Sequence, residues 1–388
     1  MRVKKRDTKE TRPYGAEWYA IAAAVLFGIA APFSKLLLDG MGPVTLAAVV
    51  YTGAALGMTC YYLWIRSSTG GRAAQEAPFI KADIPWIASS IVIGCIGATI
   101  LLMVSLQYTQ AATAALLLSF EGVTTTLIAV FIFKEQVSLR IVVALGLITL
   151  ACILISYEPG TALMLSLGSI GILLTCTAWG IETNLNRHLS GKDPVLLNTV
   201  RAWISAGALL LIAFVLAESL PAPLFIGGAL ILGCISFSGV AAIWFFKALR
   251  GLGAARTGSI IGMNPIFGIL VSFLIFQTLP EPVFFIAFFC VIIGLYFLFS
   301  DRHVHLHTHP EEWHEHSHHH MDGHHNHQHE DENPPVSRTG YHSHLHHHTE
   351  LVHNHPHKPD IHHRHRHSRT DTGTVDPGIG DEGESARV

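Results

Sequence analysis

The stretch AATAALLLSFEGVTTTLIAVFIFKEQVS, residues 111–138, places a glutamate inside an apolar run of membrane-spanning length. A related stretch, GAARTGSIIGMNPIFGILVSFLIFQTLPEP, covers residues 253–282, and the two align without a gap at an offset of 143. This alignment pairs Glu121-Gly122 with Asn264-Pro265. Crossing a bilayer takes about 20 mostly apolar residues. The chain therefore contains an internal repeat that is long and apolar enough to lie in a membrane.

A second pair of segments repeats earlier in each half. LFGIAAPFSK, residues 26–35, aligns with AWGIETNLNR, residues 178–187, at an offset of 152. Each half has five apolar runs, so a half ends on the opposite side of the membrane from where it began. The second copy must then be inserted upside down. Inverted repeats of this kind are typical of secondary carriers, with the substrate site near the midplane between the halves.

The composition supports a membrane protein. Half of the 388 residues are hydrophobic and 14% are charged, against about a quarter charged in soluble domains. We predict an all-α integral membrane fold of ten transmembrane helices arranged as an inverted 5+5 repeat. The expected spans are 18–38, 44–64, 84–106, 113–133, 139–156, 165–185, 195–216, 225–246, 257–276 and 283–300.

Lysine and arginine alternate between the predicted loops. The N-terminal segment and the loops after the second, fourth, sixth and eighth spans contain them, whereas the loops at 107–112, 157–164, 218–224 and 277–282 contain none. Short loops rich in lysine and arginine stay in the cytoplasm. We therefore expect a multi-pass protein of the plasma membrane with both termini in the cytoplasm.

Four regions follow from this pattern. Residues 1–17 form a basic cytoplasmic segment, 18–157 the first repeat, 158–300 the second repeat, and 301–388 a polar tail. The tail contains 25 of the 26 histidines and lacks apolar periodicity, so we expect it to be disordered. The chain thus combines a membrane body with a His-rich cytoplasmic extension.

The two quoted pairs of segments resemble the EamA-type permeases of the drug/metabolite transporter superfamily. The resemblance covers roughly residues 18–300, and the tail is foreign to it. It implies transport of small solutes, mostly outward, but leaves the solute open. The family usually has Glu-Pro in the fourth span. Here Glu121 is followed by Gly122, while the second half keeps Asn264-Pro265.

Polar residues inside the spans are candidates for the substrate site, because an unpaired ionisable group in a membrane is costly. Glu121 lies nine residues into its span, with Thr125 one turn further along the same face. Glu121 could bind a cationic group or carry a proton, or it could be hydrogen-bonded within the protein. The candidate substrate-binding residues are Glu121, Thr125, Trp179, Glu182, Asn186 and Asn264.

The second half has the more polar first span. Glu182 and Asn186 share one helix face, and Trp179 could line a central cavity or simply pack there. The alternative for Glu182 is a structural ion pair with Arg187 or Arg201. Asn264-Pro265 removes one helix hydrogen bond and frees a carbonyl group beside a possible ligand.

The tail is a candidate metal-binding region, because imidazole is a ligand for Ni, Zn, Co and Cu. Histidines recur in His-x-His repeats, which a flexible tract could assemble into several sites. The tail could also act as a pH-dependent switch or be a tolerated extension. The candidate metal ligands are His303, His305, His307, His309, His314, His316, His318, His342, His344, His346, His353, His355 and His357.

These patterns favour a carrier over an enzyme or a nucleic-acid-binding protein. No nucleophile–base pair, phosphate-binding glycine loop or nucleic-acid motif is evident, so we expect no catalysis, no cofactor for transport and no nucleic acid partner. The expected partners are the lipid bilayer, a small-molecule substrate and, through the tail, divalent metal ions. Two alternatives stay open. One is a divalent metal exporter whose tail collects ions, and the other is a membrane-anchored metal store or sensor without transport.

Overall fold

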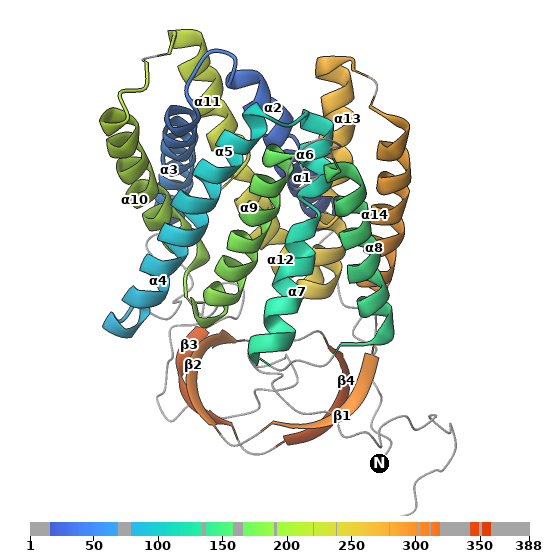
Figure 1. The fold of residues 1–388 in the computed structure, drawn as a ribbon. Helices are drawn as coiled ribbons and strands as arrows, with labels where there is room; N and C mark the ends of the chain where they lie inside the picture. The colour runs from blue at the N-terminus through green and yellow to red at the C-terminus, as the bar shows by residue number, and fades with distance from the viewer. Residues whose placement is uncertain are drawn as a thin grey trace, which may run out of the picture.

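A computed structural model gives the fold (Figure 1). It describes residues 16–68, 79–133, 137–157, 166–189, 192–219, 221–237, 239–278 and 280–300, and four strands beyond residue 300. The first repeat contains α1 (Ala16–Gly28), α2 (Ala30–Leu37), α3 (Pro43–Ser68), the 3-10 turn η1 (Lys81–Asp83), α4 (Ile84–Ser90), the π-helix η2 (Ile91–Ala98), α5 (Thr99–Gln107), α6 (Ala111–Leu117), α7 (Phe120–Phe133) and α8 (Leu139–Ser156).

The second repeat is built in the same way. Its elements are α9 (Leu167–Asn186), the 3-10 turn η3 (Arg187–Leu189), α10 (Pro194–Val215), α11 (Pro223–Ile235), α12 (Val240–Ile261), α13 (Asn264–Phe276) and α14 (Pro282–Ser300). The helical body is thus all-α, as the sequence predicts. Because no water in the bilayer can satisfy backbone groups, a helix is one of the few structures able to cross it.

Seven helices of the described residues are long and apolar enough to cross a membrane. Two further apolar helices, Asn264–Phe276 and Pro282–Leu298, are shorter. Helix α9 is not among the seven, because its polar residues lower its hydropathy. These helices confirm an all-α membrane protein but not the predicted number of ten spans. One predicted boundary also differs. The expected loop after Phe246 lies inside α12, where no proline interrupts Val240–Ile261.

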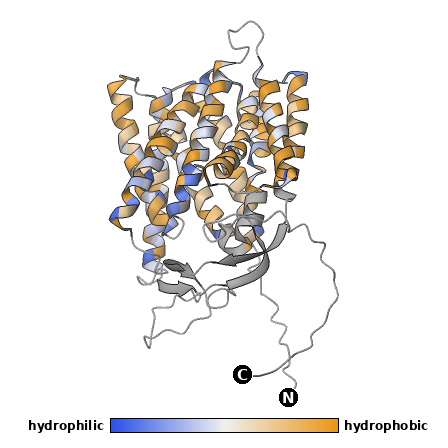
Figure 2. Cartoon of the chain, turned by 60° about the horizontal axis from the view of Figure 1, so that its bottom comes forward, coloured by the Kyte–Doolittle hydropathy of each residue, from blue (hydrophilic) through white to orange (hydrophobic). Residues whose placement is uncertain are grey.

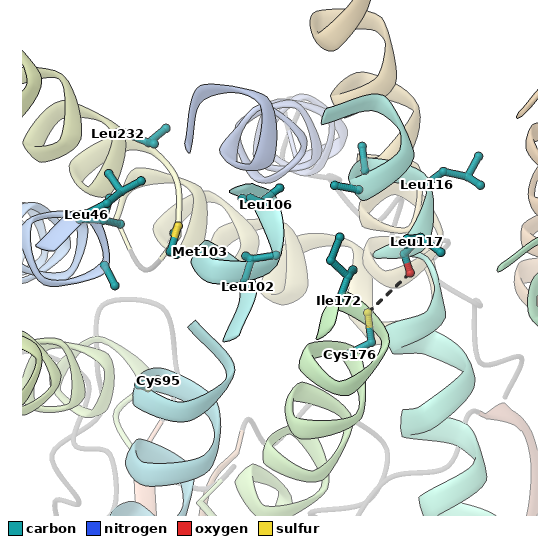
Figure 3. Packing of buried hydrophobic residues seen from close by; sticks show 14 of the residues in the cluster. Leu46, Cys95, Leu102, Met103, Leu106, Leu116, Leu117, Ile172, Cys176 and Leu232 are labelled. Carbon is teal, nitrogen blue, oxygen red and sulfur yellow. Dashed lines mark hydrogen bonds between the residues drawn. The ribbon is translucent and has the colours of Figure 1, made fainter. Parts of the chain in front are cut away.

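The outside of the helical body is apolar. Large hydrophobic side chains such as Leu167, Phe214 and Leu224 are more than 80% exposed. Figure 2 shows apolar residues along most of the helices, with hydrophilic residues gathered toward helix ends. Such a surface would be insoluble in water and suits a lipid environment. Inside, side chains such as Leu46, Met103 and Leu116 are fully buried (Figure 3).

The two repeats pack against each other through equivalent contacts. Helix α3 packs on α10, and α8 packs on α14, which are matching spans of the two halves. The first span of each half also crosses the fourth span of the other half, because α1 contacts α13 and α9 contacts α7.

Glycines make these two crossings close. A Cβ on Gly180 would lie 2.6 Å from Thr124 Oγ1 and 2.9 Å from the Thr125 nitrogen. A Cβ on Gly28 would collide with the Asn264 carbonyl. Gly28 and Gly180 correspond at the offset of 152, so both crossings depend on glycine at the same repeat position.

Acidic side chains fix the starts of two helices. Glu218 accepts hydrogen bonds from the backbone nitrogens of Val44 at 3.2 Å and Thr45 at 2.7 Å, at the N-terminus of α3. Asp193 Oδ1 accepts from the nitrogens of Val195 and Leu196 at the start of α10. Each carboxylate satisfies backbone donors that lack an intrahelical partner.

The sequence predicts disorder for the tail, residues 301–388. The residues described there form four short strands: β1 (His303–His309), β2 (Glu312–His318), β3 (His342–His348) and β4 (Leu351–His357). Strands β1 and β4 pair antiparallel, as do β2 and β3. The His-x-His pattern repeats every two residues, and this is the period of a strand.

Candidate functional site

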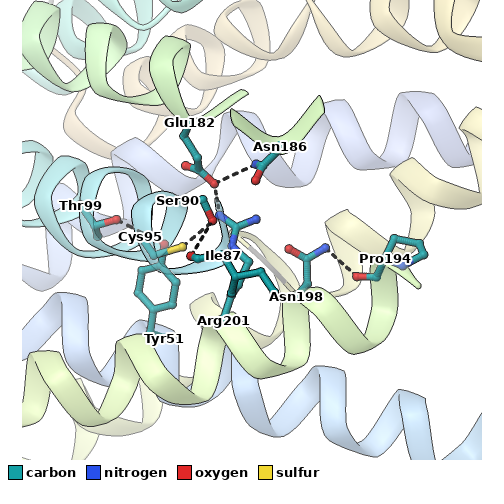
Figure 4. Close-up of polar contacts among 10 residues, drawn as sticks. All are labelled: Tyr51, Ile87, Ser90, Cys95, Thr99, Glu182, Asn186, Pro194, Asn198 and Arg201. Atoms are coloured by element: carbon teal, nitrogen blue, oxygen red, sulfur yellow. Dashed lines mark hydrogen bonds and ion pairs between the residues drawn. The ribbon is translucent and has the colours of Figure 1, made fainter. Parts of the chain in front are cut away.

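An ion pair lies within the helical body, between α9 and α10. An Arg201 terminal nitrogen, Nη2, donates to Glu182 Oε1, and their side chains are 9% and 14% exposed. The same nitrogen lies 3.1 Å from Cys95 Sγ of η2. Figure 4 shows the guanidinium extending from α10 into the space between Glu182 and Cys95. A charge in a membrane needs such a partner, and the pair is neutral as a whole.

A glycine of the π-helix leaves room for this pair. The Glu182 carboxylate lies against Gly94 of η2. A Cβ added at Gly94 would collide with this carboxylate. Short π-helical segments are rare and occur frequently at functional sites. Below the pair, the Tyr51 hydroxyl lies 3.4 Å from Thr99 Oγ1 and continues the polar contacts toward α3 (Figure 4).

Several polar atoms around the pair have no partner among the described residues. Asn186 donates from Nδ2 to Glu182 Oε1 at 3.2 Å, but its Oδ1 is buried and unpaired. Arg201 Nε is also buried without an acceptor, and so is the hydroxyl of Ser205 one turn along α10. Buried polar groups in folded proteins nearly always have partners. These atoms therefore form a place where a polar ligand or water would gain hydrogen bonds.

Glu121 lies at a break between two helices. Helix α6 ends at Leu117, and α7 begins at Phe120, so Glu121 is in the first turn of α7. The helix N-terminus favours a negative charge there. Glu121 is partly buried, and the part of the chain that the structure describes gives its carboxylate no hydrogen-bond or ion-pair partner.

The corresponding residue of the second half, Asn264, also begins a helix. Helix α12 ends at Ile261 and α13 starts at Asn264, with Pro265 in its first turn. The break therefore recurs at the same repeat position as the one before Glu121. The two breaks lie in the two fourth spans, each crossed by the first span of the other half.

Helix α9 joins the two parts of the site with different faces. One face carries Cys176, Gly180 and Asn184 and packs on α7. Thr124 donates to the Cys176 carbonyl at 2.8 Å, and Asn184 Nδ2 donates to the Thr125 carbonyl at 3.2 Å. The other face carries Glu182 and Asn186. Thr125 thus contributes its backbone to the helix contact.

Trp179 is partly buried and packs against the apolar core. Three residues that the site includes were not among the candidates. The sequence suggests Arg201 only as an alternative ion-pair partner of Glu182, although a lone arginine in an apolar run is itself a signal of a site residue. Asn184 and Cys95 could not be singled out from the sequence. Asn184 belongs to a helix crossing and Cys95 to a π-helix, and neither feature is visible in the sequence.

The thirteen histidine candidates lie in β1–β4, outside the side chains that the structure describes. Their backbone register is nonetheless regular: His305 lies opposite His355, and His316 lies opposite His344. Among the described residues, no group of three or more His, Cys, Asp or Glu side chains could hold a metal ion.

The comparisons with known proteins agree with this architecture. The model of the EamA-like transporter family matches twice, over residues 15–157 and 166–300. The chain is 26% identical over 275 residues to an uncharacterized transporter of Methanothermobacter thermautotrophicus, covering 68% of this chain and 78% of that protein. It is 25% identical over 208 residues to the uncharacterized transporter YyaM of Bacillus subtilis, covering 51% and 68%.

A solved structure shares the fold. A crystal structure of another protein superposes with a TM-score of 0.53 and 15% identity, covering 73% of this chain and 96% of that one. At this identity the likeness concerns the fold alone. The two family matches, by contrast, cover most of the chain and confirm the resemblance that the repeated segments carry. The chain belongs to the EamA-like transporter family, and it is a multi-pass membrane transporter.

Proposed function

We propose that the protein is a secondary transporter that exports a small metabolite or drug-like solute across the plasma membrane by alternating access. The observation that carries this proposal is the pairing of polar groups with helix breaks between the two repeats. Glu121 and Asn264 begin their helices at equivalent repeat positions, and α9 connects Glu121 to the pair of Glu182 and Arg201. Carriers place substrate groups at discontinuous helices near the midplane.

The proposed substrate-binding residues are Glu121, Thr125, Trp179, Glu182, Asn186 and Asn264. The Glu121 carboxylate and Asn186 Oδ1, which have no partner among the described residues, are acceptors for a donor on the solute. Both termini are proposed to be cytoplasmic, with export as the direction. The lysine and arginine pattern of the loops supports this orientation.

The test is an export assay that works before the solute has been identified. Cells expressing the full chain, the Glu121→Gln variant or an empty vector are compared by untargeted mass spectrometry of medium and cytoplasm. We expect at least one metabolite to accumulate in the medium with the full chain and to stay inside with Glu121→Gln. Equal metabolite profiles in all three, with both proteins confirmed in the membrane, would contradict the proposal.

A second role is proposed for the tail, namely binding of Ni, Zn, Co or Cu. The supporting observation is the register of the strands, in which histidines lie opposite histidines at alternate positions. Alternate residues of a strand share one face of a sheet, and directly opposite residues share it too. The register places three opposed pairs of histidines at alternate positions of each two-stranded sheet.

The metal exporter and the metal store differ from the metabolite carrier in one measurable way. Cellular nickel, cobalt and zinc are measured in cells expressing residues 1–300, the full chain or an empty vector. Lower metal with residues 1–300 would favour metal export by the helical body. Higher metal with the full chain alone would favour a store. Unchanged metal with residues 1–300, with the protein confirmed in the membrane, is the result that our proposal expects.

A further inference from the structure

Arg201 has more hydrogen-bonding capacity than the protein uses. A guanidinium has five N–H donors in a fixed planar fork. Here Nη2 makes both contacts, one with Glu182 Oε1 and one with Cys95 Sγ. Among the described residues no group accepts from Nε or Nη1, and Nε is completely enclosed. One edge of the fork is therefore left without an acceptor inside the helical body.

Such an arrangement is poor for a purely structural ion pair. A buried pair offsets its desolvation only when geometry is good and the remaining donors are also satisfied. Glu182 contacts Arg201 through a single oxygen, and that oxygen also accepts from Asn186. Arginine and a carboxylate commonly form two parallel hydrogen bonds. This pair uses one, so it leaves the guanidinium available to a second carboxylate.

The surroundings fit a ligand that brings an acceptor group. Ser205, one turn from Arg201 on α10, has a buried hydroxyl without a partner among the described residues, and this hydroxyl could donate to an anion. Asn186 also lies beside the pair, with an unpaired carbonyl oxygen that could accept from a hydroxyl or amine of the same ligand. The guanidinium is thus a donor for an acidic group, and the Ser205 hydroxyl is a further donor one turn away on α10.

We propose that Arg201 is a substrate-binding residue for a carboxylate group of the transported solute, and that Glu182 is the internal anion that occupies Arg201 when the carrier is empty. This inference rests on the proposed transport function and narrows its substrate class to organic acids. The exchange also has an electrostatic reason. The empty pair is neutral, so the empty carrier can change conformation without an uncompensated charge in the membrane.

The test is ligand-induced thermal stabilisation of the purified full chain in detergent, because a ligand that binds only the folded state raises its unfolding temperature. The probes are benzoate, succinate and pyruvate, each compared with its uncharged amide at equal ionic strength. A simple amine, ethanolamine, and a neutral sugar, glucose, complete the set. We expect at least one carboxylate to raise the unfolding temperature, and its amide to have no effect.

Variants assign that effect to Arg201. The double variant Glu182→Gln/Arg201→Gln removes both charges, so it stays neutral and can fold, and it should lose the carboxylate response. Its matched control is Asp83→Asn/Lys192→Gln, which neutralises an ion pair of 3.0 Å near the ends of the same spans and should keep the response. Arg201→Lys should weaken binding about tenfold or more, because lysine lacks the fork.

Glu182→Gln alone gives the sharpest readout, since it removes the internal competitor. We expect it to bind the same carboxylate more tightly than the wild type does. Equal responses of wild type and the neutral double variant would overturn the proposal. So would stabilisation by ethanolamine or glucose alone, or by no probe. The metabolite export assay is independent of these probes, so failure of the carboxylate inference and failure of transport can be told apart.

Discussion

The first spans of the two halves share one packing position but differ in chemistry. Gly28 of α1 crosses α13, and Gly180 of α9 crosses α7, at equivalent points of the repeat. Beyond this glycine the first half stays nearly apolar, whereas the second becomes polar. The equivalent positions, at the offset of 152, are Ala30 and Glu182, Pro32 and Asn184, and Ser34 and Asn186.

This difference indicates that both halves share the packing framework, whereas the polar groups are concentrated in the second half. The glycine crossings are needed in both halves, because inverted copies exchange roles when a carrier turns from one side of the membrane to the other. Binding groups need to be present only once. We infer that the repeat supplies the moving framework and that α9 supplies most of the recognition, with Arg201 of α10 as its partner.

The largest expected effect comes from breaking the ion pair of the polar half. Glu182→Gln leaves Arg201 buried without a counter-ion, and unpairing a buried charge typically lowers stability by about 3–5 kcal/mol. The measurement is the unfolding temperature of the full chain in detergent. The neutral double variant Glu182→Gln/Arg201→Gln should lose much less than the sum of the two single changes. Additive losses would mean that the two side chains do not interact.

The next effect tests the shared scaffold. Gly180→Ala pushes a methyl group against the Thr125 backbone, and Gly28→Ala pushes one against the Asn264 carbonyl. Overpacking of this kind costs about 1–3 kcal/mol. Both variants should therefore unfold at lower temperature, and by similar amounts if the crossings are equivalent.

Gly207→Ala in α10 is the matched control for the glycine variants. Nothing lies within 4 Å of its added Cβ, so the better helix propensity of alanine should leave stability equal or raise it by up to about 1 kcal/mol. If all three glycine variants behave alike, close approach is not the reason for the glycines at 28 and 180.

A smaller effect is expected for Asn184, which replaces Pro32 in the polar half. Its side chain donates to the carbonyls of Thr125 at 3.2 Å and Gly180 at 2.8 Å. Asn184→Ala should lower stability by about 1 kcal/mol, as for a typical hydrogen bond. Unfolding temperature is again the measurement. A loss as large as that of Glu182→Gln would show that Asn184 is more than a link between α9 and α7.

The smallest effect on stability should belong to Glu121→Gln. The described part of the chain gives this carboxylate no partner, so a neutral isostere removes no internal contact. Stability should stay equal or rise slightly, while export falls. The unfolding temperature measures stability, and the metabolite assay measures export. Unchanged export with this variant would remove Glu121 from the proposed site.

Much of the fold could be predicted from residue patterns. Apolar runs and the two offsets identified an all-α membrane body built from repeats, because hydrophobicity and length decide membrane spans. The register also pairs Glu121 with Asn264, but the helix break before Glu121 was not predicted, because residues 113–133 read as one continuous span. The continuous helix α12 could not be foreseen, since the basic residues within it suggested a loop.

The site was harder to predict than the fold. Glu182 and Asn186 were identified by their spacing on one helix, which is a local property. Arg201 lies on another helix, and its unused donors become evident only when burial and partners are known. The strands of the tail were missed because its composition favoured disorder, although the His-x-His period was present.

The most direct test of the account is whether Glu121 can be reached from both sides of the membrane. Cysteine is placed at position 121 in a chain whose six native cysteines are replaced by alanine. A membrane-impermeant maleimide is then applied to right-side-out and to inverted vesicles. Alternating access predicts labelling from both sides. Labelling from one side only, or from neither, would contradict a carrier whose central site turns between them.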